Sequence, residues 1–280
     1  MSTNNCYLEA IELRHSALNW LLADDPIRKV NGVSDLQKAY LAKQVLLDIN
    51  AQLDINLIGN RPIPGRPSKP ELVPPLSVKK RSMRSEEGRA ALIHALCHIE
   101  FNAINLALDA VWRFAGMPAQ YYEDWLKVAA EEAYHFSLLN NHLKTLGYQY
   151  GDFSGHNALW EMVERTQEDV LARMALVPRT MEARGLDATP AIRNKIAQAG
   201  DQPAAEILDI ILRDEIGHVS IGNHWFNYLC QQRDLAPIAT FDNLCQQYRA
   251  PKLRPPFNMD ARRKAGFTEM ELAYLNGETV

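Results

Sequence analysis

Two copies of the pattern Glu-x-x-His carry the strongest chemical signal in the sequence: Glu132-Ala133-Tyr134-His135 and Glu215-Ile216-Gly217-His218. On an α-helix, residues three apart lie nearly one above the other, so each copy directs one carboxylate and one imidazole to the same side. These two groups together suit iron and related divalent metals. The repeated pattern therefore predicts a metal site built from two helices.

Each copy has a glutamate at a matching distance upstream. Glu100 precedes the first motif glutamate by 32 residues, and Glu182 precedes the second by 33. Residues at equal height on antiparallel helices are equally far from the connecting turn. Turn-forming residues lie near both midpoints, at Gly116-Met117-Pro118 and Gly200-Asp201. The sequence therefore predicts two helical hairpins, each with a glutamate on one arm and Glu-x-x-His on the other.

The predicted site holds two metal ions. Four-helix bundles bind such a pair with two Glu-x-x-His helices and one glutamate from each of two further helices. Four buried carboxylates would repel one another, and two divalent cations remove that cost. We expect two iron ions, or manganese or a mixed pair, with Glu132 and Glu215 as bridging, catalytic ligands. The full predicted ligand set is Glu100, Glu132, His135, Glu182, Glu215 and His218.

Plainer interpretations exist for parts of this pattern. A single Glu-x-x-His more often marks an exposed pair on a surface helix, but both copies here lie on apolar helix seams. The alternative for Glu182, three residues before Gly185, is a local ion pair with Arg179 or Arg184. Three other acids of the same stretch are expected on a solvated face: Glu161, Glu164 and Glu168.

Acidic residues also directly precede the two motif glutamates. A histidine that binds a metal usually donates its other ring N–H to a carboxylate or a carbonyl. We predict that Asp214 orients His135 and that Glu131 orients His218, and the alternative for both acids is a surface charge. Four further histidines are expected to be packed or solvated and not to bind metal: His94, His98, His142 and His224.

Helical periodicity extends along the chain, and no strand pattern of any length occurs. Four long helices are expected. The first begins at the N-cap Ser85, and the other three span about 119–146, 157–184 (ending at Gly185) and 202–231. Shorter helices are expected at 5–23, 33–57, 190–199 and 268–275, with turns at 24–26 and 31–32 between the first two. Proline-rich irregular segments are expected at 59–84 and 250–266.

These elements predict an all-α protein organised around a four-helix bundle. Residues 1–84 would form N-terminal helices and a linker packed on the bundle, 85–232 the bundle with its dinuclear site, and 233–280 a C-terminal helix and wrapping tail. The seam steps of three and four residues are typical of left-handed bundles.

Composition narrows the class of protein. The chain has 280 residues, of which 47% are hydrophobic, and a net charge of −4, so no global charge favours nucleic acid. Its four cysteines, Cys6 among them, have no zinc spacing and indicate a reduced compartment. Without a signal peptide or an 18-residue apolar run, we expect a cytoplasmic protein that does not bind membranes. Basic segments at 79–84 and 249–264 could bind RNA, but pairing with acidic surface groups is the plainer expectation.

The residues around the six predicted ligands resemble the ferritin-like di-iron superfamily. Five segments carry the resemblance: His98-Ile99-Glu100, Ala110–Phe114, Ala130–Phe136, Glu182–Asp187 and Arg213–His218. They look like a bacterial ferritin-like family of unknown function, distantly similar to the di-iron hydroxylase that modifies a tRNA base. The resemblance covers about residues 85–232 and implies a ferritin-like four-helix bundle with a metal pair, with extra N-terminal helices and a C-terminal extension. It implies no particular reaction.

The leading functional expectation is an O₂-activating di-iron oxidoreductase of the hydroxylase or oxidase type. Its partners would be O₂, a substrate that the sequence does not identify, and an electron-donor protein, and we expect a monomer or dimer. One alternative is a ferroxidase or iron-handling protein without storage. A second is a metal-stabilised binding or scaffold protein that uses the basic loops.

Overall fold

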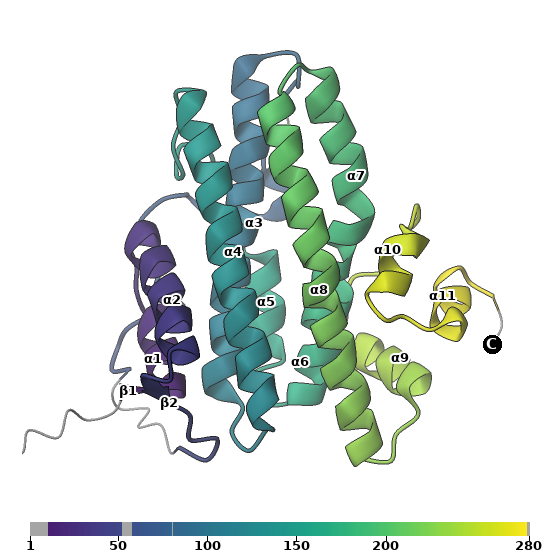
Figure 1. Ribbon diagram of the computed structural model, residues 1–280. Helices are drawn as coiled ribbons and strands as arrows, with labels where there is room; N and C mark the ends of the chain where they lie inside the picture. Colours follow the sequence, from purple (N-terminus) through teal and green to yellow (C-terminus); the bar gives the residue numbers. More distant parts are fainter. Residues whose placement is uncertain (1–10, 52–57, 80, 279–280) are drawn as a thin grey trace, which may run out of the picture. The chain divides into compact units, whose positions relative to one another are not determined.

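The computed structural model describes residues 11–51, 58–79 and 81–278, and most of these residues are helical (Figure 1). The all-α class expected from the sequence is confirmed as a helical bundle fold. The described residues include one pair of two-residue parallel strands, β1 (Ile11–Glu12) and β2 (Val45–Leu46). Contacts divide the chain into two compact units: unit 1 is Met1–Lys69 with Glu100–Ser137, and unit 2 is Pro70–Ile99 with Leu138–Val280.

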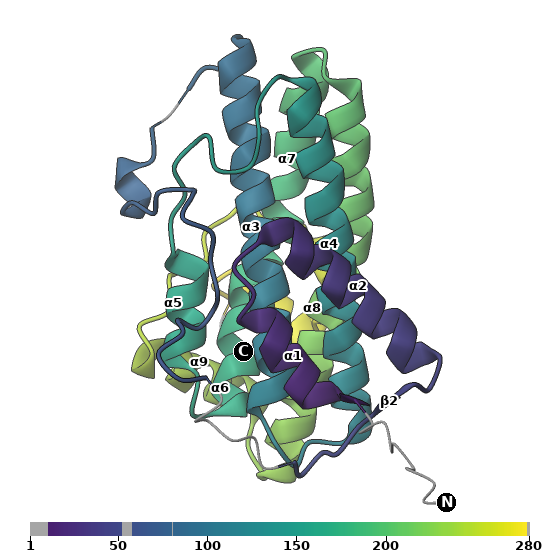
Figure 2. The same ribbon diagram turned by 90° about the vertical axis from the view of Figure 1, so that its left-hand side faces the viewer.

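Unit 1 starts with two helices joined by a short turn, α1 (Leu13–Leu21) and α2 (Pro26–Leu41) (Figure 2). The Asp25 carboxylate accepts a hydrogen bond from the Arg28 amide at 2.7 Å, which caps α2 at its start. Gly32 lies in the middle of α2 against Trp20, where a Cβ atom would be 2.3 Å from the indole ring. Gly32 therefore lets these two helices approach closely.

Two expectations for this region are wrong. Residues 31–32 are helical and form no turn, because Gly32 is used for helix packing. The second helix starts at Pro26 and ends at Leu41, and does not span 33–57; Lys43 then adopts a left-handed φ of 59° before β2. Residues 5–10 and 52–57 of the expected helices, with Cys6, lie outside the described residues.

The first predicted hairpin is confirmed by two continuous helices, α3 (Glu86–Arg113) and α4 (Ala119–Thr145). The Ser85 hydroxyl accepts a hydrogen bond from the Gly88 amide at 3.1 Å, as expected of the N-cap. Gly116, with φ 76°, lies in the turn between the helices. By length and composition α3 could cross a membrane, but 72% of its most apolar window is buried, as in the core helix of a bundle.

The proline-rich linker at 59–84 contains a single helical turn among its described residues, η2 (Pro75–Ser77). In unit 1 the Gly65 amide donates to the Leu21 carbonyl at 2.9 Å. In unit 2 the Val73 amide donates to the Gly155 carbonyl at 2.9 Å. Each end of the linker is therefore fastened to helices or loops of its own unit.

In unit 2, four helical segments replace the expected helices 157–184 and 190–199: α5 (Ala158–Arg165), α6 (Val170–Leu176), the π-helix η3 (Val177–Glu182) and α7 (Ala183–Gln198). The break between α5 and α6 ends at Asp169, whose carboxylate caps α6 by accepting a hydrogen bond from the Leu171 amide at 3.0 Å. The last long helix, α8 (Gln202–Gln232), confirms the expected helix 202–231, and it is capped by Asp201. Helices α7 and α8 lie side by side (Figure 1).

The predicted helix end at Gly185 is wrong, because α7 continues through both Gly185 and Pro190. Proline has no N–H, so Pro190 cannot bond to the Leu186 carbonyl one turn earlier. The Asn258 side chain donates to that carbonyl instead, at 3.1 Å. Asn258, which compensates for Pro190, is 72 residues from Leu186 along the chain. A local sequence pattern does not include this donor and therefore predicts that the helix ends.

The π-helix η3 has Pro178 as its second residue and packs against α8. The Ala183 amide donates to the Pro178 carbonyl five residues earlier, which is the bonding pattern of a π-helix. Gly222 of α8 faces Pro178, and a Cβ atom at Gly222 would be 2.4 Å from the proline Cβ. A side chain at position 222 would therefore push α8 away from η3.

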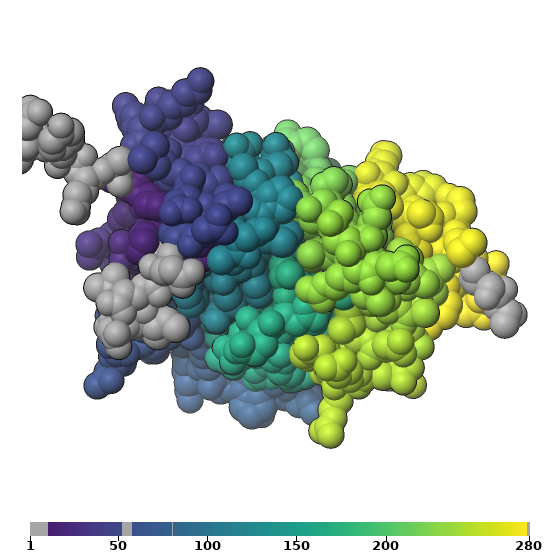
Figure 3. Space-filling view, turned by 90° about the horizontal axis from the view of Figure 1, so that it is seen from below, coloured from purple at the N-terminus to yellow at the C-terminus, as the bar shows by residue number. Residues whose placement is uncertain are grey.

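Three short helices complete the described chain: α9 (Pro237–Gln247), α10 (Met259–Lys264) and α11 (Glu269–Leu275). The last confirms the helix expected at 268–275, and Thr268 and Glu271 form a capping box at its start. Helices α9 and α10 were not expected from the sequence. Arg262 of α10 forms an ion pair with Asp187 of α7 at 2.6 Å. Figure 3 shows α9 and the C-terminal segment adjoining on one face.

Candidate metal centre

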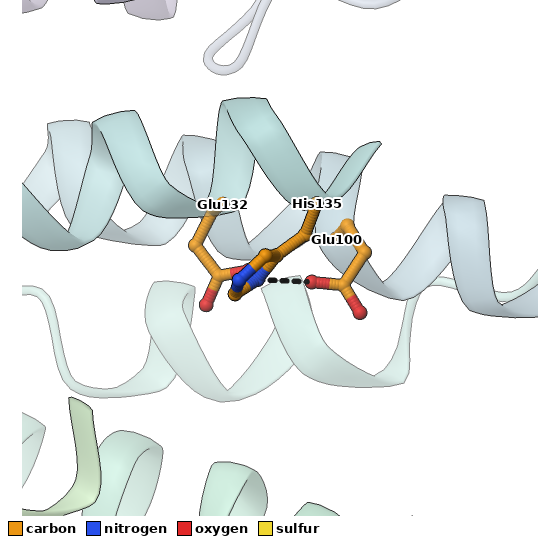
Figure 4. Close-up of side chains that lie close together, drawn as sticks. All are labelled: Glu100, Glu132 and His135. Carbon is orange, nitrogen blue, oxygen red and sulfur yellow. Dashed lines mark hydrogen bonds and ion pairs between the residues drawn. The ribbon is translucent and has the colours of Figure 1, made fainter. Parts of the chain in front are cut away.

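Three of the six predicted ligands come together in unit 1 (Figure 4). Glu100 is on α3, and Glu132 and His135 are on α4. The Nδ1 atom of His135 lies 3.4 Å from a carboxylate oxygen of Glu100 and 3.4 Å from one of Glu132. The three side chains are 3%, 0% and 0% exposed, so they form a buried cluster of two carboxylates and one imidazole.

The cluster stabilises positive charge. Burial, and then repulsion from Glu132, raise the pKa of Glu100 to about 8. Burial alone would lower the pKa of His135, but its contacts with Glu100 and Glu132 outweigh burial and raise it to about 12. Both raised pKa values favour bound protons, because two carboxylates and one imidazolium alone leave one uncompensated negative charge inside the protein. A bound cation can supply the same compensation.

The distances within the cluster suit a shared metal ion. A charge-assisted N–H···O bond is usually about 2.7–2.9 Å long, so contacts of 3.4 Å are long for an ion pair. Two donor atoms that bind one ion at about 2.1 Å, at right angles or tetrahedrally, lie roughly 3.0–3.4 Å apart. Phe101 and Phe136, which follow Glu100 and His135 in the sequence, are buried as well, and their ring centroids lie 5.9 Å apart. The donor set and its spacing thus fit a metal.

Unit 2 carries the same three residue types. Glu215 and His218 are on α8, and the His218 Nδ1 atom lies 3.9 Å from a carboxylate oxygen of Glu215. Glu182 is the last residue of η3, which packs against α8. All three residues are buried, with exposures of 8% for Glu182, 8% for Glu215 and 0% for His218. Burial of acids at these positions is what a ligand set requires.

The other acids of the α5–α6 stretch differ from Glu182. Glu161 is exposed and lies 3.7 Å from Arg165, and Glu164 accepts a hydrogen bond from Trp160 at 2.9 Å. Glu168 is exposed as well. The expected solvated face is therefore confirmed, and Glu182 is the one buried acid of the four.

The two acids expected to orient the histidines lie at the edges of their helices. Glu131 is 30% exposed, with an oxygen 3.8 Å from Lys127. Asp214 is 15% exposed and accepts a hydrogen bond from Arg213 at 2.8 Å. Their proposed pairing with His218 and His135 stays a prediction.

Three of the histidines expected not to bind metal have other hydrogen-bond partners. His94 accepts a hydrogen bond from the Gly151 amide at 2.9 Å, and burial lowers its pKa to about 4. His98 contacts the Tyr150 hydroxyl at 2.9 Å. His142 contacts a carboxylate oxygen of Asp201 at 2.9 Å. These side chains serve local packing.

Sequence patterns did not identify Lys29 as a buried cation of unit 1. The Lys29 ammonium donates to the carbonyls of Leu21 and Gly65, at 3.1 and 3.0 Å, and to Asn105 at 2.5 Å. Burial, and then the charge of Arg66, lower its pKa to about 7. A lysine in an amphipathic helix normally indicates a solvated face, so no local signal marks Lys29.

Comparison with known proteins supports a family assignment. The family model described as "Protein of unknown function (DUF455)" matches residues 22–273. An uncharacterized protein of Haemophilus influenzae is 51% identical over 258 residues, which cover 90% of this chain and 89% of that protein. No solved structure matches the chain. Because the family model spans most of the chain and the relative is similar over nearly its whole length, the chain belongs to the DUF455 family.

Proposed function

We propose that this protein is an O₂-activating di-iron oxidoreductase of the ferritin-like superfamily. The observation that carries the proposal is the buried cluster of Glu100, Glu132 and His135, with its long contacts and its preference for positive charge. Two carboxylates and one imidazole are a donor set typical of iron in helical bundles.

The proposal assigns one ligand set to each of two metal ions. Glu100, Glu132 and His135 would hold one ion, and the matching residue types of unit 2 would hold the other: Glu182, Glu215 and His218. The repeated motif and the matched intervals of 32 and 33 residues support this assignment. Iron, when bound, supplies the electrons that reduce O₂.

The residues of the chain have distinct parts in this proposal. Glu132 and Glu215 would bridge the ions, Glu100 and Glu182 would each bind one ion, and the histidines would complete the two sets. The apolar packing of Phe101 and Phe136 would exclude water from the first set. Manganese fits the same donors and is the alternative metal.

Iron loading tests the proposal. Apo protein is incubated anaerobically with Fe²⁺ and desalted, and iron is determined by elemental analysis. We expect about two iron ions per chain and rapid O₂ consumption by the loaded protein. Glu132→Ala should remove most of this iron, whereas Glu168→Ala, which changes an exposed glutamate, should leave two, with circular dichroism as a check on folding.

The same experiment separates the alternatives. An iron content near zero, or an equal loss in both variants, contradicts the metal centre. Aerobic loading with a large excess of Fe²⁺ should stop at about two ions per chain, in a monomer or dimer by light scattering. A large shell that accumulates tens of iron ions per chain would instead indicate storage.

A further inference from the structure

Unit 2 contains a cavity of about 620 Å³ that the metal centre does not use. It is lined by residues of η3, α9, the loop at 248–253 and the C-terminal segment around α11. Figure 3 shows the adjoining surfaces of α9 and that C-terminal segment. Cavities of about 300–1,000 Å³ are typical of sites for small organic ligands.

Two buried arginines form the inner wall of this cavity. Arg179 of η3 is 2% exposed and Arg262 of α10 is 0% exposed. Arg179 forms an ion pair with Glu271 and donates to Asn223 at 2.9 Å. Arg262 donates to Asp187 at 2.6 Å. Buried guanidiniums on a cavity wall are costly unless each N–H group has an acceptor.

Each of these arginines has an N–H group without an acceptor. Among the described residues, no hydrogen-bond partner is present for the Nε atom of Arg179 or for one terminal nitrogen of Arg262. These two nitrogens are themselves buried, so it is the positive charge of the two side chains lining the cavity that favours an occupant with anionic oxygens. Burial lowers the pKa of Arg179, and the charge of Glu271 opposes this effect.

The charge of the lining is positive overall. Four cationic side chains line the cavity, Arg179, Arg249, Lys252 and Arg262, against two carboxylates, Asp242 and Glu271. Glu271 is paired with Arg179, and Asp242 accepts a hydrogen bond from Gln246 at 2.9 Å. The exposed Arg249 holds a left-handed φ of 51°, a conformation that non-glycine residues rarely adopt and that is often found at functional sites.

The rest of the lining is apolar and aromatic. Phe241 and Phe267 lie under the Arg179 guanidinium, with ring centroids 5.1 and 4.8 Å away. Tyr274, Leu253 and Ile238 line the same space. Aromatic and aliphatic walls suit the body of an organic molecule, and the arginines suit a carboxylate or a phosphate on it.

We propose that this cavity is a binding site for a small organic anion, an apolar or aromatic body that carries a carboxylate or a phosphate. The site is formed within unit 2 and goes beyond the proposed metal chemistry. The proposal of an anion site therefore remains valid even if the protein binds no iron. The cavity also shares an element with the proposed metal centre, because Arg179 and the candidate ligand Glu182 belong to the same six-residue π-helix. An occupant would contact the element that ends at Glu182.

Fluorescence of 1-anilinonaphthalene-8-sulfonate, itself an aromatic anion, is the probe. We expect saturable binding of about one dye per folded chain in the micromolar range. Decanoate, indole-3-acetate and AMP are then tested as competitors, each against its neutral counterpart: decanol, indole and adenosine. At least one anion should displace the dye on the order of tenfold better than its counterpart. The anion that displaces best decides between carboxylate and phosphate.

Variants of the lining locate the site. The double change Arg249→Ala and Lys252→Ala removes two exposed cations at the rim and should weaken dye binding about tenfold. Lys264→Ala, an exposed lysine of α10 outside the lining, is the matched control and should leave binding unchanged. Arg179→Met should weaken it on the order of 100-fold. Thermal melts show whether Arg179→Met is folded. If it is not, the comparison of the rim variant with Lys264→Ala tests the proposal.

Three results would overturn the proposal. The first is the absence of saturable dye binding to the folded protein. The second is equal binding by the rim variant and the Lys264→Ala control. The third is displacement by neutral molecules as effective as by their anions, which would show an apolar cavity without anion recognition.

Discussion

In the hairpin of α3 and α4 both arms are continuous α-helices, whereas the chain before α8 passes through two short helices and a π-helix before α7 begins. The candidate ligands follow this difference. Glu100 lies in the middle of α3, and Glu182 is the last residue of η3. Two ligand sets of matching sequence spacing are therefore carried by elements of different kinds.

This difference shows two ways of placing a carboxylate. A continuous α-helix repeats the direction of its side chains every 3.6 residues, so the direction of Glu100 follows from the helix itself. A π-helix interrupts that repeat, and its position depends on contacts from elsewhere, such as Gly222 against Pro178. The second ligand set should accordingly be more sensitive to changes in packing than the first.

The largest expected effect is the loss of metal when either lone glutamate is removed. Glu100→Ala and Glu182→Ala should each lower iron affinity by more than about 100-fold, a larger loss than orienting residues usually cause. Glu164→Ala and Glu168→Ala are the controls, because both side chains are exposed. Iron per chain after anaerobic loading is the measurement. If either control loses more iron than Glu182→Ala, the second ligand set is misassigned.

The next effect is a dependence of folding stability on pH that arises from Lys29 of unit 1. The pKa of Lys29 falls from 10.5 to about 7 on folding, so between these values the unfolded chain binds more protons at this group, and the contribution of Lys29 to stability rises with pH. The buried Arg179 and Arg262 of unit 2 keep their protons in this range. Lys29→Met should remove this contribution, which we expect to reach a few kcal/mol, while the opposite contribution of His135 is the same in both proteins.

Urea unfolding at pH 7 and at pH 10 measures this effect as the difference between the wild type and the variant. Lys38→Met changes a lysine whose side chain is 71% exposed and is the control, with the same difference at both pH values. A difference for Lys29→Met that does not grow with pH would show that the ammonium stays protonated in the folded protein.

The smallest effect concerns the packing that places η3. Gly222→Ala puts a Cβ atom 2.4 Å from a rigid proline, and we expect it to lower the free energy of unfolding by about 1–3 kcal/mol. Gly185→Ala in α7 meets no atom within 4 Å and should stabilise the helix by up to about 1 kcal/mol. Urea unfolding of the apo protein compares the two. Equal effects would mean that η3 is not held by its contact with α8.

Much of the helical framework could be predicted, because its signals are local. The helices α3, α4 and α8 begin at or within one residue of the expected positions. Ser85 caps α3, Asp201 caps α8, and Gly116 and Gly200 lie in the turns before α4 and α8. The turn expected at 31–32 and the helix end expected at Gly185 were wrong for one shared reason. Gly32 packs on Trp20, and Asn258 compensates for Pro190, and neither partner is visible in a local window.

The sequence by itself identified the candidate metal ligands, because the three-residue spacing in Glu-x-x-His directs both side chains to one side of any helix. Only the tertiary structure decided that Glu100 lies 3.4 Å from His135, since this contact joins two helices. It also decided that Lys29 and Arg179 are buried and that Arg179 and Arg262 line one cavity. Burial and proximity depend on the packing of segments far apart in the chain, and local periodicity carries no information about those partners.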